Sequence, residues 1–291
     1  MSPVIAPPPA AEGRHIVDTL IEERAQALMH RSIVWRLVRT FIYPLLGYRQ
    51  AVDMADRISG MTGQQVFDYL SARLRLAVDC QGLEHVPALG SAVITANHPA
   101  GIADGVAVYD ALKRVRPDIT FFANRDAIRV APGLADMVVP VEWMETRRSH
   151  CRGRETVRHM VEAFRSQRLI VIFPSGRLAQ PTLKGLVERG WQPSAVSLAQ
   201  RYGSPVIPMH IRARSSWLYY FFYILNQELR DMTLFRELLN KRGHPYQIRV
   251  GEPFRPTGDP RELSLQLRAF VAEAMPRGAS RFDPTGTDKP A

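Results

Sequence analysis

From residue 76 onward, short apolar runs rich in β-branched residues alternate with helical runs, and this alternation constrains the fold more than any other feature. The short runs are predicted strands, over residues 76–79, 92–96, 119–123, 138–141, 169–173, 206–211 and 247–250. Helical periodicity appears between or after them, over residues 106–115, 155–165, 194–201 and 260–275. Apolar strands separated by helices are typical of sheets covered on both faces. The sequence therefore predicts an α/β fold, a largely parallel mixed sheet flanked by helices, with functional loops at the strand ends.

The residues before this region are helical rather than alternating. Apolar side chains recur at helical spacing over residues 15–30 and again over about 52–75. The start of the chain has no basic region leading into an apolar run, so no secretory signal is expected. We therefore expect a disordered tail at 1–13, an N-terminal helical arm at 14–75, the α/β domain at 76–276 and a second disordered tail at 277–291.

Two segments have the composition of membrane-surface helices. In residues 32–43, Arg36 and Arg39 interrupt apolar side chains at helical spacing, which suits either a lipid interface or packing on the same domain. The aromatic run at 217–225 is either a core helix, which we favour, or an interfacial anchor. No stretch reaches the roughly 18 uninterrupted apolar residues that a bilayer-spanning helix needs. If the protein contacts a membrane, it is expected to lie on the surface, through the arm at 14–75.

The charge of the chain points to anionic partners. Lys and Arg number 38 against 28 Asp and Glu, a formal net charge of +10, which suits phosphorylated molecules, nucleic acid or an acidic membrane. A nucleic-acid-binding module is the weaker of these readings, because the arginines are dispersed and no nucleic-acid motif is present. The two cysteines and eight histidines form no metal-ligand spacing, so no metal is expected.

One loop carries the strongest signal for chemistry. The sequence Asn97-His98-Pro99-Ala100-Gly101 follows the predicted strand 92–96 directly, and Asp104 stands at the start of the next helix. A histidine at a strand end with a carboxylate nearby can act as a base whose ring that carboxylate orients. On one continuous helix the two would lie about 240° apart, so they can meet only if the Pro-Ala-Gly stretch is a loop. The alternative is a structural histidine, with Asp104 acting as a helix cap.

Four motifs in order resemble those of the glycerolipid and lysophospholipid acyltransferase superfamily, over roughly residues 76–256. The first runs from Asn97 to Asp104, and the others are Asn124-Arg125-Asp126 with Pro132-Gly133, Phe173-Pro174-Ser175-Gly176-Arg177, and Val206-Ile207-Pro208-Met209. The segments at 188–191 and 214–220 are similar to the haemolysin-like branch of that superfamily.

The resemblance implies roles for particular residues. His98 and Asp104 would be catalytic, and Asn97, Gly101, Arg125, Ser175, Gly176 and Arg177 would contact substrate. Two departures from the usual motifs stand out. Five residues rather than four separate His98 from Asp104, and Ser175 occupies a position that is more commonly Glu, which puts a glycerol-3-phosphate type of acceptor site in doubt.

The resemblance also implies an activity: acyl transfer from acyl-CoA or acyl carrier protein, as co-substrate, to a hydroxyl of a lyso-lipid such as lysophosphatidic acid, in membrane lipid synthesis. An amino-acid-linked acceptor such as lyso-ornithine lipid is the main alternative, favoured by the Ser175 departure. Such an O-acyltransferase would work as a peripheral protein at the cytoplasmic face of an anionic membrane.

Overall fold

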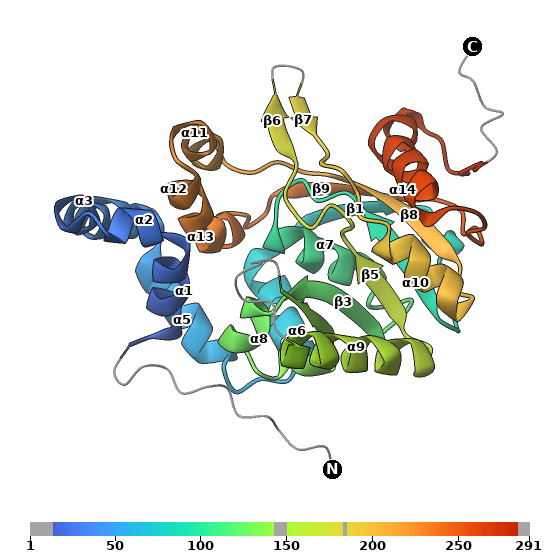
Figure 1. The fold of residues 1–291 in the computed structure, drawn as a ribbon, viewed down its shortest axis with the longest axis horizontal. Helices are drawn as coiled ribbons and strands as arrows, with labels where there is room; N and C mark the ends of the chain where they lie inside the picture. Colours follow the sequence, from blue (N-terminus) through green and yellow to red (C-terminus); the bar gives the residue numbers. More distant parts are fainter. Residues whose placement is uncertain (1–13, 143–149, 183–184, 285–291) are drawn as a thin grey trace.

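The computed structural model describes residues 14–142, 150–182 and 185–284, and its centre is a seven-stranded sheet (Figure 1). In spatial order the strands are β1 (Ala77–Gln81), β9 (Pro245–Val250), β8 (Val206–Arg212), β2 (Ala92–Ala96), β5 (Leu169–Ile172), β3 (Ile119–Asn124) and β4 (Val138–Val141). Every neighbouring pair is parallel except β8 and β9. The predicted α/β fold and its largely parallel mixed sheet are confirmed, and each predicted strand corresponds to an observed one.

Two hydrophobic cores cover the two faces of this sheet. Strand β2 sends Ile94 to one core and Val93 to the other, and β5 divides Leu169 and Ile170 in the same way, because successive side chains of a strand point to opposite faces. The first core contains α7 (Ile102–Leu112) and the N-terminal helices. The second contains residues of α9 (His150–Arg165), α10 (Ser194–Tyr202) and α14 (Pro260–Ala269). Sheets buried in this way have near-continuous apolar strands, as the sequence shows.

The N-terminal helices share the first core rather than standing apart from it. They are α1 (Ile16–Arg24), α2 (Gln26–Met29), α3 (Ser32–Leu37), a π-helical segment (Val38–Ile42), α4 (Tyr43–Leu45), α5 (Tyr48–Ile58) and α6 (Gly63–Leu74). Val17 and Leu20 of α1 are buried in that core. Arg24 of α1 also pairs at 2.6 Å with Asp126 of α8 (Asp126–Val130). The arm expected at 14–75 is therefore packed against the sheet domain.

The aromatic run forms α11 (Trp217–Leu225), which has one buried face and one exposed face. Leu218, Tyr219 and Phe222 are buried, whereas the exposed large apolar residues are Trp217, Phe221, Ile224 and Leu225. The expected core packing therefore holds for one face only. Two short helices follow, α12 (Gln227–Met232) and α13 (Leu234–Leu239). No helix within the described ranges is long and apolar enough to cross a bilayer.

Two local features differ from the sequence-based expectation. A small antiparallel hairpin of β6 (Gln180–Thr182) and β7 (Gly185–Val187) follows β5 and was not predicted. At the other end, the tail expected at 277–291 is packed at least to Phe282, which is 7% exposed and contacts Phe254 and Phe270. That aromatic contact supplies the apolar burial that the composition of the tail did not suggest. Residues 1–13 and 285–291 of the expected tails lie outside the described residues.

Candidate active site

The predicted site residues gather at one edge of the sheet. Strands β2, β3, β5 and β8 run parallel to one another, so their carboxyl ends meet at the same edge. His98 follows β2, Arg125 follows β3, and Ser175 with Arg177 follows β5. Because β2 lies between β5 and β8, His98 stands between the loop of Arg177 and the end of β8.

His98 and Asp104 form a hydrogen-bonded pair. The His98 Nδ1 atom lies 2.8 Å from Asp104 Oδ2, and the Asp104 side chain is completely buried while that of His98 is 18% exposed. With Nδ1 donating to the carboxylate, Nε2 keeps the lone pair that accepts a proton. The loop from Pro99 to Gly101 brings the two together despite the extra residue between them. Asp110, the next aspartate along α7, instead accepts hydrogen bonds from Ser71 of α6 and from Lys113.

The start of α7 fixes the carboxylate. Asp104 Oδ2 also accepts hydrogen bonds from the backbone N–H groups of Ala100 at 2.9 Å and Gly101 at 3.1 Å. Gly101 has φ +84°, a conformation that side chains other than glycine rarely adopt, and a Cβ there would lie 3.3 Å from Leu178. Gly101 thus shapes the loop and donates to Asp104. The helix N-terminus further stabilises the negative charge.

Phe173, Ser175 and Gly176 build a turn against the His98 ring. The Phe173 ring stacks on the imidazole with centroids 4.4 Å apart. The Gly176 N–H donates to Phe173 O at 2.9 Å, and the Ser175 hydroxyl donates to Arg177 O at 2.8 Å. Gly176 adopts φ +59°, which suits glycine. Ser175 and Gly176 therefore stabilise the turn. Because the Gly176 N–H donates to Phe173 O, it is not free to bind a substrate oxygen.

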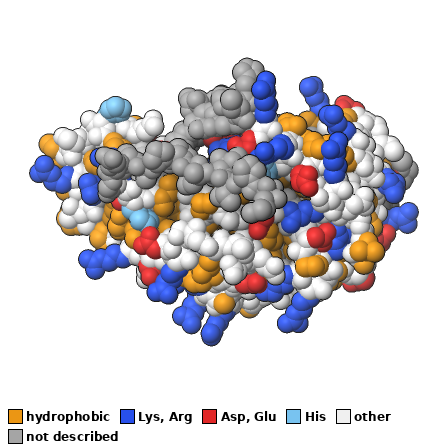
Figure 2. All heavy atoms as spheres, turned by 90° about the horizontal axis from the view of Figure 1, so that it is seen from below, with side chains coloured by type: hydrophobic (Ala, Val, Ile, Leu, Met, Phe, Trp, Pro, Cys, Tyr) orange, Lys and Arg blue, Asp and Glu red, His pale blue; other side chains and the backbone are white. Residues whose placement is uncertain are grey.

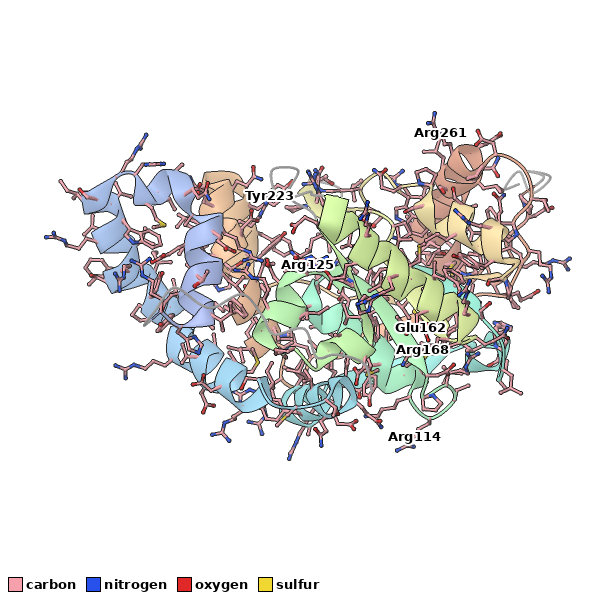
Figure 3. The ribbon with its side chains drawn as sticks, turned by 60° about the horizontal axis from the view of Figure 1, so that its bottom comes forward. Arg114, Arg125, Glu162, Arg168, Tyr223 and Arg261 are labelled. Carbon is pink, nitrogen blue, oxygen red and sulfur yellow. The ribbon has the colours of Figure 1, made fainter. Side chains whose placement is uncertain are left out.

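The two motif arginines differ in their surroundings. Arg125, labelled at the centre of Figure 3, pairs with Glu155 of α9 at 2.5 Å, and its side chain is 15% exposed. Arg177 is exposed, and its guanidinium pairs with no carboxylate of the described residues. Because Arg177 is exposed and Arg125 is paired with Glu155, Arg177 is the better placed of the two to bind an anionic group of a substrate.

Asn97 joins the histidine loop to β8. Its Nδ2 donates to Ile211 O at 2.8 Å, and its Oδ1 accepts from Ile211 N at 2.7 Å. Both hydrogen-bonding ends of the buried amide are used in this way. Asn97 therefore fixes the end of β8 beside His98. The predicted contact of its amide with substrate would require these hydrogen bonds to Ile211 to break.

Two buried residues near the pair were not singled out in the sequence. Glu188 accepts from Trp191 Nε1 at 3.1 Å and from the His98 N–H at 3.3 Å, and burial raises its pKa. Tyr246 of β9 is 1% exposed, and burial together with the charge of Asp104 raises its pKa far above the usual value. The Tyr246 hydroxyl and Asp104 Oδ1 are both buried and have no other hydrogen-bond partner among the described atoms, and the interaction between the two side chains contributes to the raised pKa of Tyr246. Neither residue lies in the four motifs, although Glu188 begins the segment 188–191 that resembles the haemolysin-like branch, and both come close to the pair only through the fold.

A cavity of about 360 Å³ adjoins this loop on the β8 side. Asn97 and Pro99, the residues on either side of His98, contribute to its wall, and so do Arg212 and Arg214. The β6–β7 hairpin forms another wall through Pro181, Thr182, Gly185 and Leu186. Within the described residues, no three His, Cys, Asp or Glu side chains are grouped to hold a metal ion.

Comparison with known proteins agrees with these motifs. The sequence model of the Acyltransferase family matches residues 77–212. The lyso-glycine lipid O-acyltransferase of Phocaeicola vulgatus is 24% identical over 219 residues, which are 72% of this chain and 76% of that protein. The crystal structure of the 1-acyl-sn-glycerophosphate (LPA) acyltransferase PlsC from Thermotoga maritima is 17% identical, with a TM-score of 0.43, over 88% of this chain and 96% of that one. Residues 77–212, which carry all four motifs, therefore match an acyltransferase domain, and the resemblance of this chain to the glycerolipid acyltransferase superfamily is confirmed.

Proposed function

We propose that this protein transfers a fatty acyl group from an acyl thioester to the hydroxyl of a lyso-lipid. The observation that carries the proposal is the His98–Asp104 hydrogen bond of 2.8 Å at the motif edge of the sheet. It leaves Nε2 of His98 as the base, next to the loops where the other motif residues gather. The donor would be acyl-CoA or acyl carrier protein, and no further cofactor is needed.

The proposed chemistry balances with these residues alone. His98 Nε2 removes the proton of the acceptor hydroxyl while the hydroxyl oxygen attacks the thioester carbonyl carbon. Asp104 holds the ring in the required tautomer and stabilises the imidazolium. When the tetrahedral intermediate collapses, the carbon–sulfur bond breaks, the thiolate leaves, and the proton on His98 neutralises it. An ester and a free thiol result, without a covalent enzyme intermediate.

The acceptor is proposed to carry an anionic head group. Arg177 would bind a phosphate or a carboxylate, because its planar guanidinium matches both. A phosphate acceptor such as lysophosphatidic acid is one candidate. An amino-acid-linked lyso-lipid is the second, favoured by Ser175 at the position usually held by Glu and by the relative that is named a lyso-glycine lipid O-acyltransferase.

We also propose that the protein works on an anionic membrane surface, as a peripheral protein on the cytoplasmic side. The π-helical region and α3 expose Ile33 (76%), Leu37 (52%) and Phe41 (67%), which recur every four residues along one stripe. Helix α11 lies at the same end of the molecule as α3 (Figure 1). The backbone of residues 27 and 28 bonds to Glu228 of α12, which joins the two regions. On the face shown in Figure 2, basic side chains are scattered among acidic and hydrophobic ones.

Purified protein tests the acyl transfer directly. It would be incubated with acyl-CoA or acyl carrier protein and, separately, with lysophosphatidic acid, lyso-ornithine lipid and lyso-glycine lipid, with products followed by mass spectrometry. We expect one acceptor to gain one acyl group, and the same lyso-lipid to accumulate in cells that lack the protein. Absence of product with every donor and acceptor would contradict the proposal.

A further inference from the structure

Strand β8 ends in two arginines at the active-site edge. Arg212 and Arg214 are exposed, lie two residues apart, and line the cavity that Asn97 and Pro99 also line. The Asn97 amide makes two hydrogen bonds to the backbone of Ile211, the residue directly before Arg212, so the end of β8 that carries these arginines is fixed relative to the histidine loop. Neither arginine belongs to the four motifs, and Arg214 begins the segment 214–220 that resembles the haemolysin-like branch.

The charges of these arginines are not neutralised by the described part of the chain. Neither guanidinium pairs with a carboxylate of a described residue, unlike Arg24, Arg125 and Arg129, which all do. Among the described residues that line the cavity, Glu188 alone is acidic. Its carboxylate accepts hydrogen bonds from Trp191 and from the His98 backbone. The hairpin wall is uncharged over its described residues. The cavity therefore presents two cations beside the base.

We propose that Arg212 and Arg214 form a second anion subsite, which binds a phosphate or carboxylate group of one of the two substrates. The inference rests on the proposed acyl transfer, in which both substrates are anionic. Acyl thioester donors carry phosphate groups, and the acceptor head group carries phosphate or carboxylate. Arg177 lies on the β5 side of His98 and the pair Arg212–Arg214 on the β8 side, so the two substrates can be held by separate cations on either side of the base.

Binding measurements on the full chain test the subsite without depending on turnover. Titration calorimetry would give the Kd of coenzyme A, of a short-chain lysophosphatidic acid and of a short-chain lyso-glycine lipid for the wild-type protein and an Arg212→Gln/Arg214→Gln variant. Arg114→Gln is the matched control, because Arg114 is an exposed arginine between α7 and β3, at the opposite edge of the sheet (Figure 3). Thermal unfolding would confirm that both variants fold.

The subsite predicts that the double substitution weakens binding of at least one probe by about tenfold or more, while Arg114→Gln changes none. Weaker binding of coenzyme A alone would assign the subsite to the donor, and weaker binding of a lyso-lipid would assign it to the acceptor. Unchanged Kd values for all three probes, or no binding of any probe to the wild type, would overturn the inference. A wild type that binds its probes through these arginines but transfers no acyl group would contradict only the proposed function.

Discussion

In the proposed mechanism, Asp104 is the carboxylate that holds the His98 ring. It is buried, accepts two backbone hydrogen bonds and orients His98. Asp104→Asn should lower kcat by roughly two to four orders of magnitude, because an amide can hold the imidazole in the wrong tautomer. Steady-state kinetics would check this, with Asp110→Asn as the control. A larger loss in the Asp110 variant would show that the wrong carboxylate has been assigned.

Arg177 should contribute substrate binding through the geometry of its guanidinium. Arg177→Lys keeps the positive charge but loses the planar fork, so KM for one substrate should rise about tenfold, equivalent to about 1.4 kcal/mol, with kcat little changed. KM measured separately for donor and acceptor identifies that substrate. Equal KM values in the wild type and in Arg177→Lys and Arg177→Ala variants would show that Arg177 is only a surface charge.

Residues of the site differ in how far the sequence predicts them. His98 and Asp104 can be found because a loop signal, Pro99 with Gly101, lies between them and because they follow a strand. The role of Asn97 cannot be found in this way, since its partner Ile211 is 114 residues away. Tyr246 lies on β9, far along the chain from Asp104, and nothing in its local sequence places it beside that residue.

At the scale of elements, an ion-pair network fastens α1 to α8. Asp126 pairs with Arg24 at 2.6 Å and with Arg129 at 2.9 Å, and Arg129 also reaches Glu23 of α1. Burial acts to raise the pKa of Asp126, but the two arginines outweigh it and the pKa is lowered. The network therefore stabilises the fold most when Asp126 is ionised.

Asp126→Asn should lower the free energy of unfolding at pH 7 by about 1–3 kcal/mol, since it removes the carboxylate that pairs with Arg24 and leaves Arg129 with Glu23 alone in a partly buried network. Because the folded pKa lies below the unfolded value of about 3.9, the stabilisation is fully present above that value and is lost as pH falls through the folded pKa. Denaturant unfolding at several pH values would test this. Asp53→Asn, in an exposed pair with Arg57, is the control and should cost no more than about 0.5 kcal/mol.

Periodicity predicts the elements of the sheet well and the short elements poorly. Strands such as β2 and β5 are continuous apolar runs, because both their faces are buried. The β6–β7 hairpin consists of two three-residue strands, and one of them contains Pro181. Strands this short show no alternation of apolar and polar residues from which they could be predicted. For α11 the composition is apolar all round, so only packing against neighbouring elements decides which face is buried.

At the scale of the whole molecule, the exposed apolar side chains of α3, the π-helical segment and α11 should govern membrane attachment. Ile33→Ser/Phe41→Ser should weaken binding to anionic liposomes at least tenfold, since each buried side chain of this size contributes about 1.5–3 kcal/mol. Point substitutions are preferred to deletion because α1 is part of the core. Leu89→Ser is the control, as Leu89 is 87% exposed in the loop before β2.

Liposome co-sedimentation measures this binding. It should require anionic lipid and weaken as salt rises, because each arginine near an acidic surface adds about 1 kcal/mol and is screened over about 8 Å at physiological salt. Equal binding to neutral and anionic vesicles, or binding to neither, would contradict the electrostatic part of the proposal.

The central claim is that His98 is the base for acyl transfer, and single-turnover kinetics of His98→Ala test it most directly. With acyl thioester bound to excess protein and acceptor added, the wild type should form product, and the variant should form it roughly two to four orders of magnitude more slowly. Thermal unfolding would verify that the variant keeps its fold. A folded His98→Ala protein that transfers the acyl group at nearly the wild-type rate would contradict the account.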